Sequence, residues 1–286
     1  MTGEILLQPL LYGLQSGVTY IIIALGLTLI FSIMNILNLA HGEFYMLGAF
    51  SILYLSGLLH INYILALFVS MVIVALIGIF CERVFFRPVI GEMAPTIIVG
   101  IGLMWVIRAA AQLIFGRQPR GMAEIWQGSL TFLDVNISES RIMAGIISVL
   151  LVGVMYFFVY RTKLGRAIQA IAQDRETAAL QGIDIDRVGI LGFALGCALA
   201  GAAGGIMAPI FFIDATMGID VLVKSIAIII LGGVGSIPGA AIGGLVLGIV
   251  ESYGHTFIGY PASLLPFLII ILVLICKPTG LMGRKL

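Results

Sequence analysis

Two pairs of ionisable side chains stand inside otherwise apolar stretches and could carry chemistry. His41 and Glu43 lie in the segment LNLAHGEFYM, residues 37–46, and no lysine or arginine precedes them. Glu251 and His255 stand four residues apart in a later apolar run. A histidine near a carboxylate can serve in acid–base catalysis, in metal binding or in a polar pathway through a membrane. The surrounding sequence discriminates among these uses.

Neither pair has the spacing of a catalytic or metal site. His41 and Glu43 lack the second histidine of the H-E-x-x-H zinc motif, so we expect no metal site. No glycine in the chain is followed by lysine, which excludes the nucleotide-binding P-loop. The segment Gly233 to Ser236 resembles a nucleophile turn only loosely, and paired catalytic groups are missing. We therefore expect a protein that is not an enzyme and binds no cofactor itself.

The composition is typical of a membrane protein. Of the 286 residues, 61% are hydrophobic and 10% are charged, whereas a soluble domain carries about 25% charged residues. A bilayer-spanning segment needs about 20 apolar residues, and only a helix or a closed barrel satisfies its backbone. Period-two alternation is missing, which favours helices. The net charge of +1 provides no basic surface for nucleic acid.

The hydrophobic pattern predicts an all-α, polytopic transmembrane helical bundle in a single domain, residues 1–286. We expect eight or nine spans, or seven if the two segments around Pro238 form a re-entrant hairpin, because glycines and this proline break the chain there. The expected spans are approximately 9–34, 36–58, 61–81, 94–115, 142–160, 188–208, 220–234, 239–256 and 262–277.

Basic residues predict the orientation of the bundle. Five lysines and arginines lie in or beside the loop 161–187, and three more lie in the last ten residues. Loops rich in lysine and arginine stay in the cytoplasm, so both segments, and with them the C-terminus, are expected there. The loop around Arg83 and Arg87 falls on the same side by parity. Residues 116–141 then form the extracytoplasmic loop.

The loop 161–187 is predicted to contain two short helices. A turn at Gly165 and Arg166 precedes apolar residues at helical spacing. Asp174 is expected to cap a second helix, which Gly182 then ends. Many side chains of this helix pair are small and apolar, so they shield the helices poorly from water. Such a surface is suited to being covered by another protein. A solvated connector is the alternative interpretation.

The second of these helices contains a recognisable spacing. Glu176 is followed by Ala178 and Ala179, and Gly182 comes six positions after the glutamate. This order resembles the E-A-A-x-x-x-G coupling motif of ABC importer permeases, with Thr177 in place of the first alanine. A degenerate motif of this length also arises by chance.

A wider resemblance covers nearly the whole chain. Four blocks follow the order and spacing of the membrane subunit of branched-chain amino acid ABC transporters, most closely the shorter Liv-type permease. The block NLAHGEFYMLGA is specific to this group, and departures are small, with Ser32 in place of an expected glycine as one example. The four blocks are residues 26–50, 165–188, 192–206 and 230–251.

The resemblance implies a role and a set of partners. Such a permease forms one half of a translocation pathway for leucine, isoleucine and valine in the bacterial inner membrane. A second related permease, expected as a heterodimer partner, forms the other half, and a periplasmic binding protein delivers the substrate. Two ATP-binding subunits hold ATP and Mg and dock on the coupling helices, here Gly165 to Gly182. Membrane lipid surrounds the complex.

The resemblance leaves the cargo and the roles of the intramembrane polar groups open. Related permeases carry urea, short amides or other amino acids, and a stand-alone secondary transporter is the alternative machine. Asn38, His41 and Glu43 could hold a helix junction near the cytoplasmic end, with an asparagine as cap, or could gate the pathway. Glu251 and His255 could form an interhelical clasp or line the pathway.

Two further cations are explained locally by the sequence. Arg108 is expected to snorkel to the outer membrane surface. Lys224 is expected to pair with Asp220 one helical turn away.

Glycines recur four residues apart, a spacing that lets helix backbones approach closely in a bilayer. The positions expected to pack helices are Gly192, Gly196, Gly201, Gly205, Gly239 and Gly243.

Overall fold

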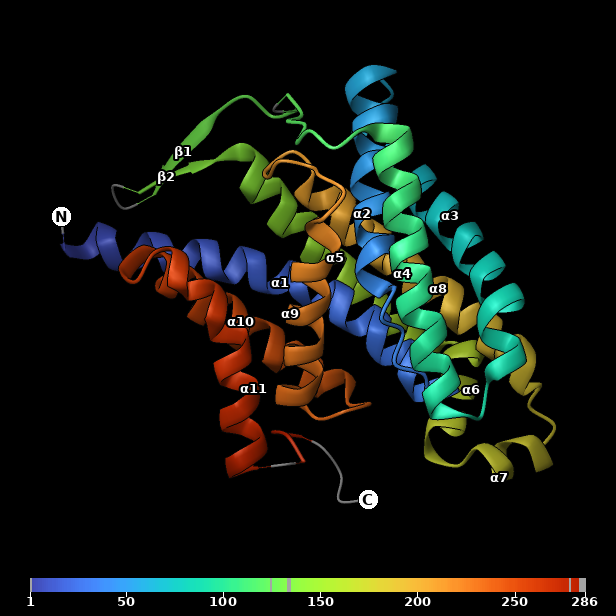
Figure 1. Ribbon diagram of the computed structural model, residues 1–286. Helices are drawn as coiled ribbons and strands as arrows, with labels where there is room; N and C mark the ends of the chain where they lie inside the picture. Colours follow the sequence, from blue (N-terminus) through green and yellow to red (C-terminus); the bar gives the residue numbers. More distant parts are fainter. Residues whose placement is uncertain (1, 124, 133–134, 278, 283–286) are drawn as a thin grey trace.

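The computed structural model describes residues 2–123, 125–132, 135–277 and 279–282, which form a helical bundle with one small hairpin (Figure 1). The elements in chain order are α1 (Thr2–Met34), α2 (His41–Ile52), η1 (Leu53–Leu58), α3 (Tyr63–Cys81), η2 (Glu82–Phe86), η3 (Arg87–Val89), α4 (Met93–Phe115), β1 (Ser129–Phe132), β2 (Val135–Ser138), α5 (Glu139–Arg161), α6 (Lys163–Gln173), α7 (Arg175–Leu180), α8 (Ile185–Met207), α9 (Met217–Gly232), α10 (Ile237–Phe257), η4 (Tyr260–Leu264) and α11 (Leu265–Cys276).

Each predicted apolar segment overlaps a helix, but the helices differ in length. Within the described residues, six are long and apolar enough to cross a membrane, and the segment Tyr260–Cys276 is shorter. The helices α2 and α9 have only 12 and 16 residues. The all-α bundle is therefore confirmed, whereas the count of eight or nine spans is not. The six long segments are Leu6–Met34, Tyr63–Val89, Met93–Phe115, Glu139–Arg161, Ile185–Met207 and Ile237–Phe257.

The two ends of the bundle carry different connections. The helices α6 and α7 and the last turn of α11 lie at the lower end in Figure 1, and the hairpin of β1 and β2 lies at the upper end. The predicted loop 116–141 thus contains an antiparallel hairpin, in which Ser129 pairs with Ser138. Ser138 also caps α5 by accepting a hydrogen bond from the Arg141 amide.

Helices α1 and α8 form the centre of the bundle. In the apolar 18-residue stretch of each of these two helices, 78% and 83% of the residues are buried, whereas the corresponding share is 28% in α4 and in α5. Because α4 and α5 expose apolar side chains along their length, their outer faces are suited to lipid. Glycines allow the central contacts: Gly17 of α1 lies against Gly244 and Gly248 of α10.

The connection between α1 and α2 runs inside the protein. Met34 packs against Gly189, near the start of α8 at the lower end, whereas Leu39 lies against Gly100 in α4. Gly100 is seven residues into α4, or about 10 Å at ~1.5 Å per residue. The connection therefore extends from the lower end to the middle of the bundle, and α2 begins there. Ordered but non-helical backbone at this depth is tolerated only where protein buries it or where it lines an aqueous cavity.

Residues 279–282 close the lower end of α9. The Leu281 amide donates to the Leu231 carbonyl at 2.8 Å, and the Met282 amide donates to the Gly232 carbonyl at 2.9 Å. These bonds satisfy carbonyls that a helix C-terminus otherwise leaves without partners. The segment after α11 is thus tied to the helix that carries Lys224.

Candidate functional site

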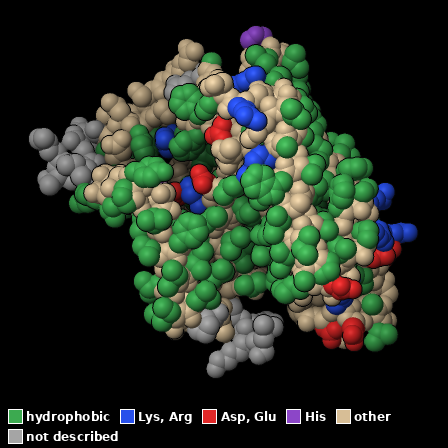
Figure 2. Space-filling model, in the orientation of Figure 1, with side chains coloured by type: hydrophobic (Ala, Val, Ile, Leu, Met, Phe, Trp, Pro, Cys, Tyr) green, Lys and Arg blue, Asp and Glu red, His purple; other side chains and the backbone are tan. Residues whose placement is uncertain are grey.

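Two groups of residues are candidates for function: the helices α6 and α7 at the lower end, and charged side chains deep inside the bundle. On the face seen in Figure 2, hydrophobic side chains predominate. Acidic and basic side chains gather in the upper half beside a hollow, and again at the lower right over α6 and α7 (Figure 2).

The predicted caps of α7 are confirmed. Asp174 Oδ1 accepts hydrogen bonds from the amides of Glu176 and Thr177, both at 3.0 Å, and the Thr177 hydroxyl donates to Oδ2 at 2.6 Å. Gly182 has a φ of +83°, the left-handed conformation that ends a helix. Arg166 and Gly165 do not form a turn, because α6 already begins at Lys163.

The Thr177 hydroxyl bond holds the pKa of Asp174 below its ordinary value, and the amide bonds act in the same direction. A lowered pKa means that the folded chain favours the carboxylate. The contribution of this cap to stability is therefore present above the ordinary carboxyl pKa and is lost as the pH falls through the lowered one. At neutral pH the cap is ionised.

The exposed surface of α7 is partly apolar. Ala178 is buried, whereas Glu176, Ala179 and Leu180 are exposed, and the Leu180 side chain is 89% exposed. Gly165 lies tightly against the backbone of Phe158 and Val159, so α6 packs closely on α5. The pair therefore rests on the bundle and presents a leucine outward.

The first turns of α2 and α9 meet inside the protein. Gly42 of α2 and Gly218 of α9 are in backbone contact, and Glu43 lies beside Gly218. Glu43 is thus close to two helix N-termini, whose dipoles favour negative charge. The predicted asparagine cap of α2 is wrong, because the Asn38 side chain accepts from the Ala40 amide at 3.0 Å and α2 has no side-chain cap.

Arg108 pairs with Glu43 rather than snorkelling to the surface. Their side chains are 5% and 1% exposed, and Arg108 Nη2 donates to Glu43 Oε1. Arg108 lies 15 residues into α4, about 22 Å from its start. Glu43 therefore lies in the upper half of the bundle, away from the end that carries α6 and α7. The pair ties α2 to α4 in a buried environment.

His41 does not join this ion pair. Its Nε2 lies 3.1 Å from the Ile23 carbonyl of α1, and the side chain is fully buried. His41 and Glu43 thus contact different helices, as expected for positions about 200° apart on a helix.

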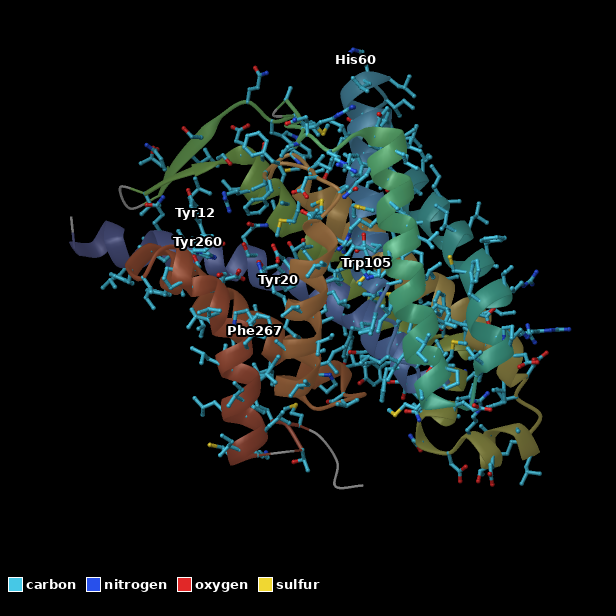
Figure 3. The ribbon with its side chains drawn as sticks, viewed as in Figure 1. Tyr12, Tyr20, His60, Trp105, Tyr260 and Phe267 are labelled. Atoms are coloured by element: carbon cyan, nitrogen blue, oxygen red, sulfur yellow. The ribbon has the colours of Figure 1, made fainter. Side chains whose placement is uncertain are left out.

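A second ion pair joins α9 and α10. Lys224 Nζ lies 2.6 Å from Glu251 Oε1 and 3.0 Å from the Tyr20 hydroxyl of α1. The side chains of Lys224 and Glu251 are 20% and 8% exposed. His255 Nε2 lies 3.5 Å from the same carboxylate oxygen. We call Tyr20, Lys224, Glu251 and His255 the polar cluster; Figure 3 labels Tyr20.

The predicted local partner of Lys224 is therefore wrong. Asp220 is exposed, and Lys224 turns instead toward α10. The geometry of Glu251 is that of an interhelical clasp, while His255 contacts it from the same helix.

Tyr20 is a member of the polar cluster that the motifs of the sequence do not single out. One signal in the sequence does point to its helix face, because polar residues recur at helical spacing on α1. These residues are Tyr12, Gln15, Ser16, Thr19 and Tyr20.

The predicted glycines face four neighbouring helices. Gly192 and Gly196 of α8 face Ile33, Gly26 and Ile30 of α1. Gly201 faces Val74 of α3, and Gly205 faces Ile52 of α2 and Leu67 of α3. The last pair faces α9: Gly239 lies against Gly232, and Gly243 lies against Ile228. Within the described residues, no three metal-binding side chains come together.

A charge swap can test the role of the Lys224–Glu251 pair. Lys224→Met is expected to lower the folded level of the chain, because it leaves the Glu251 carboxylate without its cation. Lys224→Glu combined with Glu251→Lys is expected to restore the level, measured as monodisperse protein by size-exclusion chromatography. The exposed Asp220→Asn is the control. A swap no better than Lys224→Met would contradict the clasp.

Comparison with known proteins identifies the family. Residues 10–276 match the family described as branched-chain amino acid transport system, permease component. The high-affinity branched-chain amino acid transport system permease protein BraD of Pseudomonas aeruginosa is 32% identical over 97% of this chain and 96% of its own length. The corresponding protein LivH of Escherichia coli is 31% identical over 97% and 96%.

A more distant relative and the solved structures complete the comparison. The permease protein LivM of Salmonella typhimurium is 25% identical over 92% of this chain and 67% of its own length. No solved structure matches. With almost its full length matched, this chain belongs to the family of permease components of branched-chain amino acid transport systems.

Proposed function

We propose that this chain is a permease subunit of an ATP-driven importer that moves leucine, isoleucine and valine across the bacterial inner membrane. A second related permease completes the pathway, two ATP-binding subunits dock on α6 and α7, and a periplasmic protein delivers the substrate. The observation that carries the proposal is the capped α7 with its outward leucine in a chain of this family. The distant relative LivM, also named as a permease protein of such a system, supports a heterodimer of two related permeases.

The proposal places the lower end in the cytoplasm. The basic residues of α6 and α7 lie at that end, and Arg87 pairs there with Asp186 at the start of α8, whereas the hairpin lies at the upper end. Cytoplasmic loops collect lysine and arginine. The C-terminus is then cytoplasmic, and the ATP and Mg are held by the partner subunits.

Reconstitution tests this function directly. The purified chain, assembled with the permease, the ATPases and the binding protein encoded beside its gene, is expected to take up labelled leucine into vesicles only with ATP. Uptake of urea or a short amide in place of leucine would show that the importer carries that substrate instead. Leucine uptake driven by an ion gradient without the ATPases would overturn the proposal.

A stand-alone secondary transporter is favoured by one observation. Helices that start at mid-depth, as α2 and α9 do, are typical of substrate sites in such transporters. In this chain, however, the carboxylate of Glu43 already lies at the two N-termini. The ATP-free vesicle experiment discriminates between the two machines.

The coupling role predicts selective uncoupling by variants of α7. Glu176→Lys, Leu180→Asp and Gly182→Leu are expected to leave the chain inserted but to lower ATP-dependent uptake at least tenfold. The first two alter the exposed docking surface, and the third strains the left-handed turn that ends the helix. Uptake and ATP hydrolysis by the assembled complex are measured together.

Two matched variants control for charge and strain. Glu92→Lys reverses an exposed acid at the same end of the bundle. Gly91→Leu strains an exposed glycine whose φ is +103° and whose Cβ position is open. Both are expected to transport normally. Equal losses in the α7 variants and in these controls would remove the coupling assignment.

A further inference from the structure

A groove between α1 and α5 contains an arginine that the ion pairs do not use. The groove has a cavity volume of about 420 Å³ and lies beside the hairpin end of α5. Its wall is mainly apolar, with Leu11, Ile146 and Leu150 among the lining residues, and its polar residues are Tyr12, Gln15 and Arg141. This volume is within the range of small-molecule sites.

Arg141 is held in place by uncharged groups. Its Cζ lies 4.3 Å from the ring centroid of Tyr12 and 5.6 Å from that of Phe211, and Nη1 donates to Gln15 Oε1 at 3.4 Å. No carboxylate of the described residues lies within ion-pair distance of it. The deep cations Arg108 and Lys224 each have such a partner. A half-buried guanidinium remains charged, so the groove attracts an anion.

The groove lies at one end of the polar residues of α1. Tyr12 and Gln15 contact Arg141. Further along α1, Thr19 Oγ1 lies 3.0 Å from Ser148 Oγ of α5. Tyr20 then contacts Lys224 of the polar cluster. Figure 3 labels Tyr12 and Tyr20 at successive positions along α1. A ligand bound at Arg141 is therefore close to the hairpin end of the bundle, because Ile137 of β2 also lines the groove.

We propose that this groove binds the carboxylate of an aliphatic amino acid through Arg141, with the branched side chain of the ligand against the apolar wall. A guanidinium can bind a carboxylate with two parallel hydrogen bonds. Leu11, Ile146 and Leu150 match a branched aliphatic group. The inference rests on the proposed function, because it makes the groove an early stop for the delivered substrate.

A phospholipid is the competing occupant. Leu150 is exposed at the mouth of the groove, and a lipid phosphate could use the same guanidinium. Competition separates the two occupants. If the groove recognises the carboxylate of an amino acid, leucine and 4-methylpentanoate compete for it and leucinamide, which lacks the carboxylate, does not.

Photolabelling of the assembled complex tests the proposal. A diazirine analogue of leucine is expected to label peptides of α1 and α5, as mapped by mass spectrometry. Excess leucine or 4-methylpentanoate should block the labelling, and leucinamide should not. Arg141→Gln should lower labelling about tenfold, the loss expected for a charge-assisted hydrogen bond. Arg117→Gln, an exposed arginine outside the groove, is the control and should label normally.

Three outcomes overturn the inference. These are unchanged labelling in Arg141→Gln, blocking by leucinamide equal to that by leucine, and labelling by diazirine-tailed phosphatidylglycerol alone. If Arg141→Gln does not assemble, Arg141→Lys and the competition on the unaltered complex decide the question. ATP-dependent leucine uptake is measured in the same preparation. Missing uptake refutes the proposed function, whereas normal uptake with unchanged labelling refutes only the groove.

Discussion

Arg108→Met is expected to reduce the folded level of the chain sharply. The variant leaves the Glu43 carboxylate buried without its guanidinium, and removing one partner of a buried pair costs about 3–5 kcal/mol. Proteins are stable by only about 5–15 kcal/mol, so such a loss is a large fraction of the total. The measurement is the thermal unfolding midpoint of detergent-solubilised chain, together with its level in the membrane.

The double variant separates charge from packing. Arg108→Met combined with Glu43→Gln leaves no unpaired charge, so it is expected to recover part of the lost stability. Arg117→Met removes an exposed arginine and serves as the control. Wild-type stability of Arg108→Met would contradict the structural role of the pair.

The same measurements address the alternative of a gate. His41→Ala and Glu43→Gln are expected to lower the protein level, with uptake per folded molecule preserved, because His41 contacts the Ile23 carbonyl and Glu43 contacts α4. A normal level with lost uptake would favour the gate.

Gly201→Leu is expected to prevent correct packing of α8. A Cβ atom at Gly201 would meet Val74 Cβ and Cγ2 at 2.9 Å, and valine is a stiff side chain that cannot rotate away cheaply. Overpacking typically costs about 1–3 kcal/mol, and a whole leucine side chain adds to that. The expected result is loss of monodisperse chain in size-exclusion chromatography and loss of assembly with the partner subunits.

A glycine with open space provides the matched control. Gly153 lies in the middle of α5, is exposed and has no atom within 4 Å of its Cβ position. Gly153→Leu makes the same chemical change without the clash, so it is expected to fold and assemble. Equal behaviour of the two variants would show that the contact between Gly201 and Val74 does not limit packing.

Local features of this protein follow from its sequence alone. The positions of the helices could be predicted from the apolar segments. Each segment must satisfy its own backbone groups in lipid, so this requirement acts on each segment separately. Asp174 and Gly182 were identified as the cap and stop of α7, since a cap depends on residues within three or four positions. The family was also visible, because its motifs are short and contiguous.

Which charges meet, and at what depth, depends on the tertiary structure. The partner of Glu43 is Arg108, 65 residues away, and that of Lys224 is Glu251, not the neighbouring Asp220. The start of α2 lies at mid-depth because residues 35–40 extend along α4 from the lower end toward the middle of the bundle. In a bilayer, helices associate through the shape of small-residue contacts and through polar bonds between distant segments. Sequence spacing gives the face on which a residue lies, but the opposing helix determines its partner.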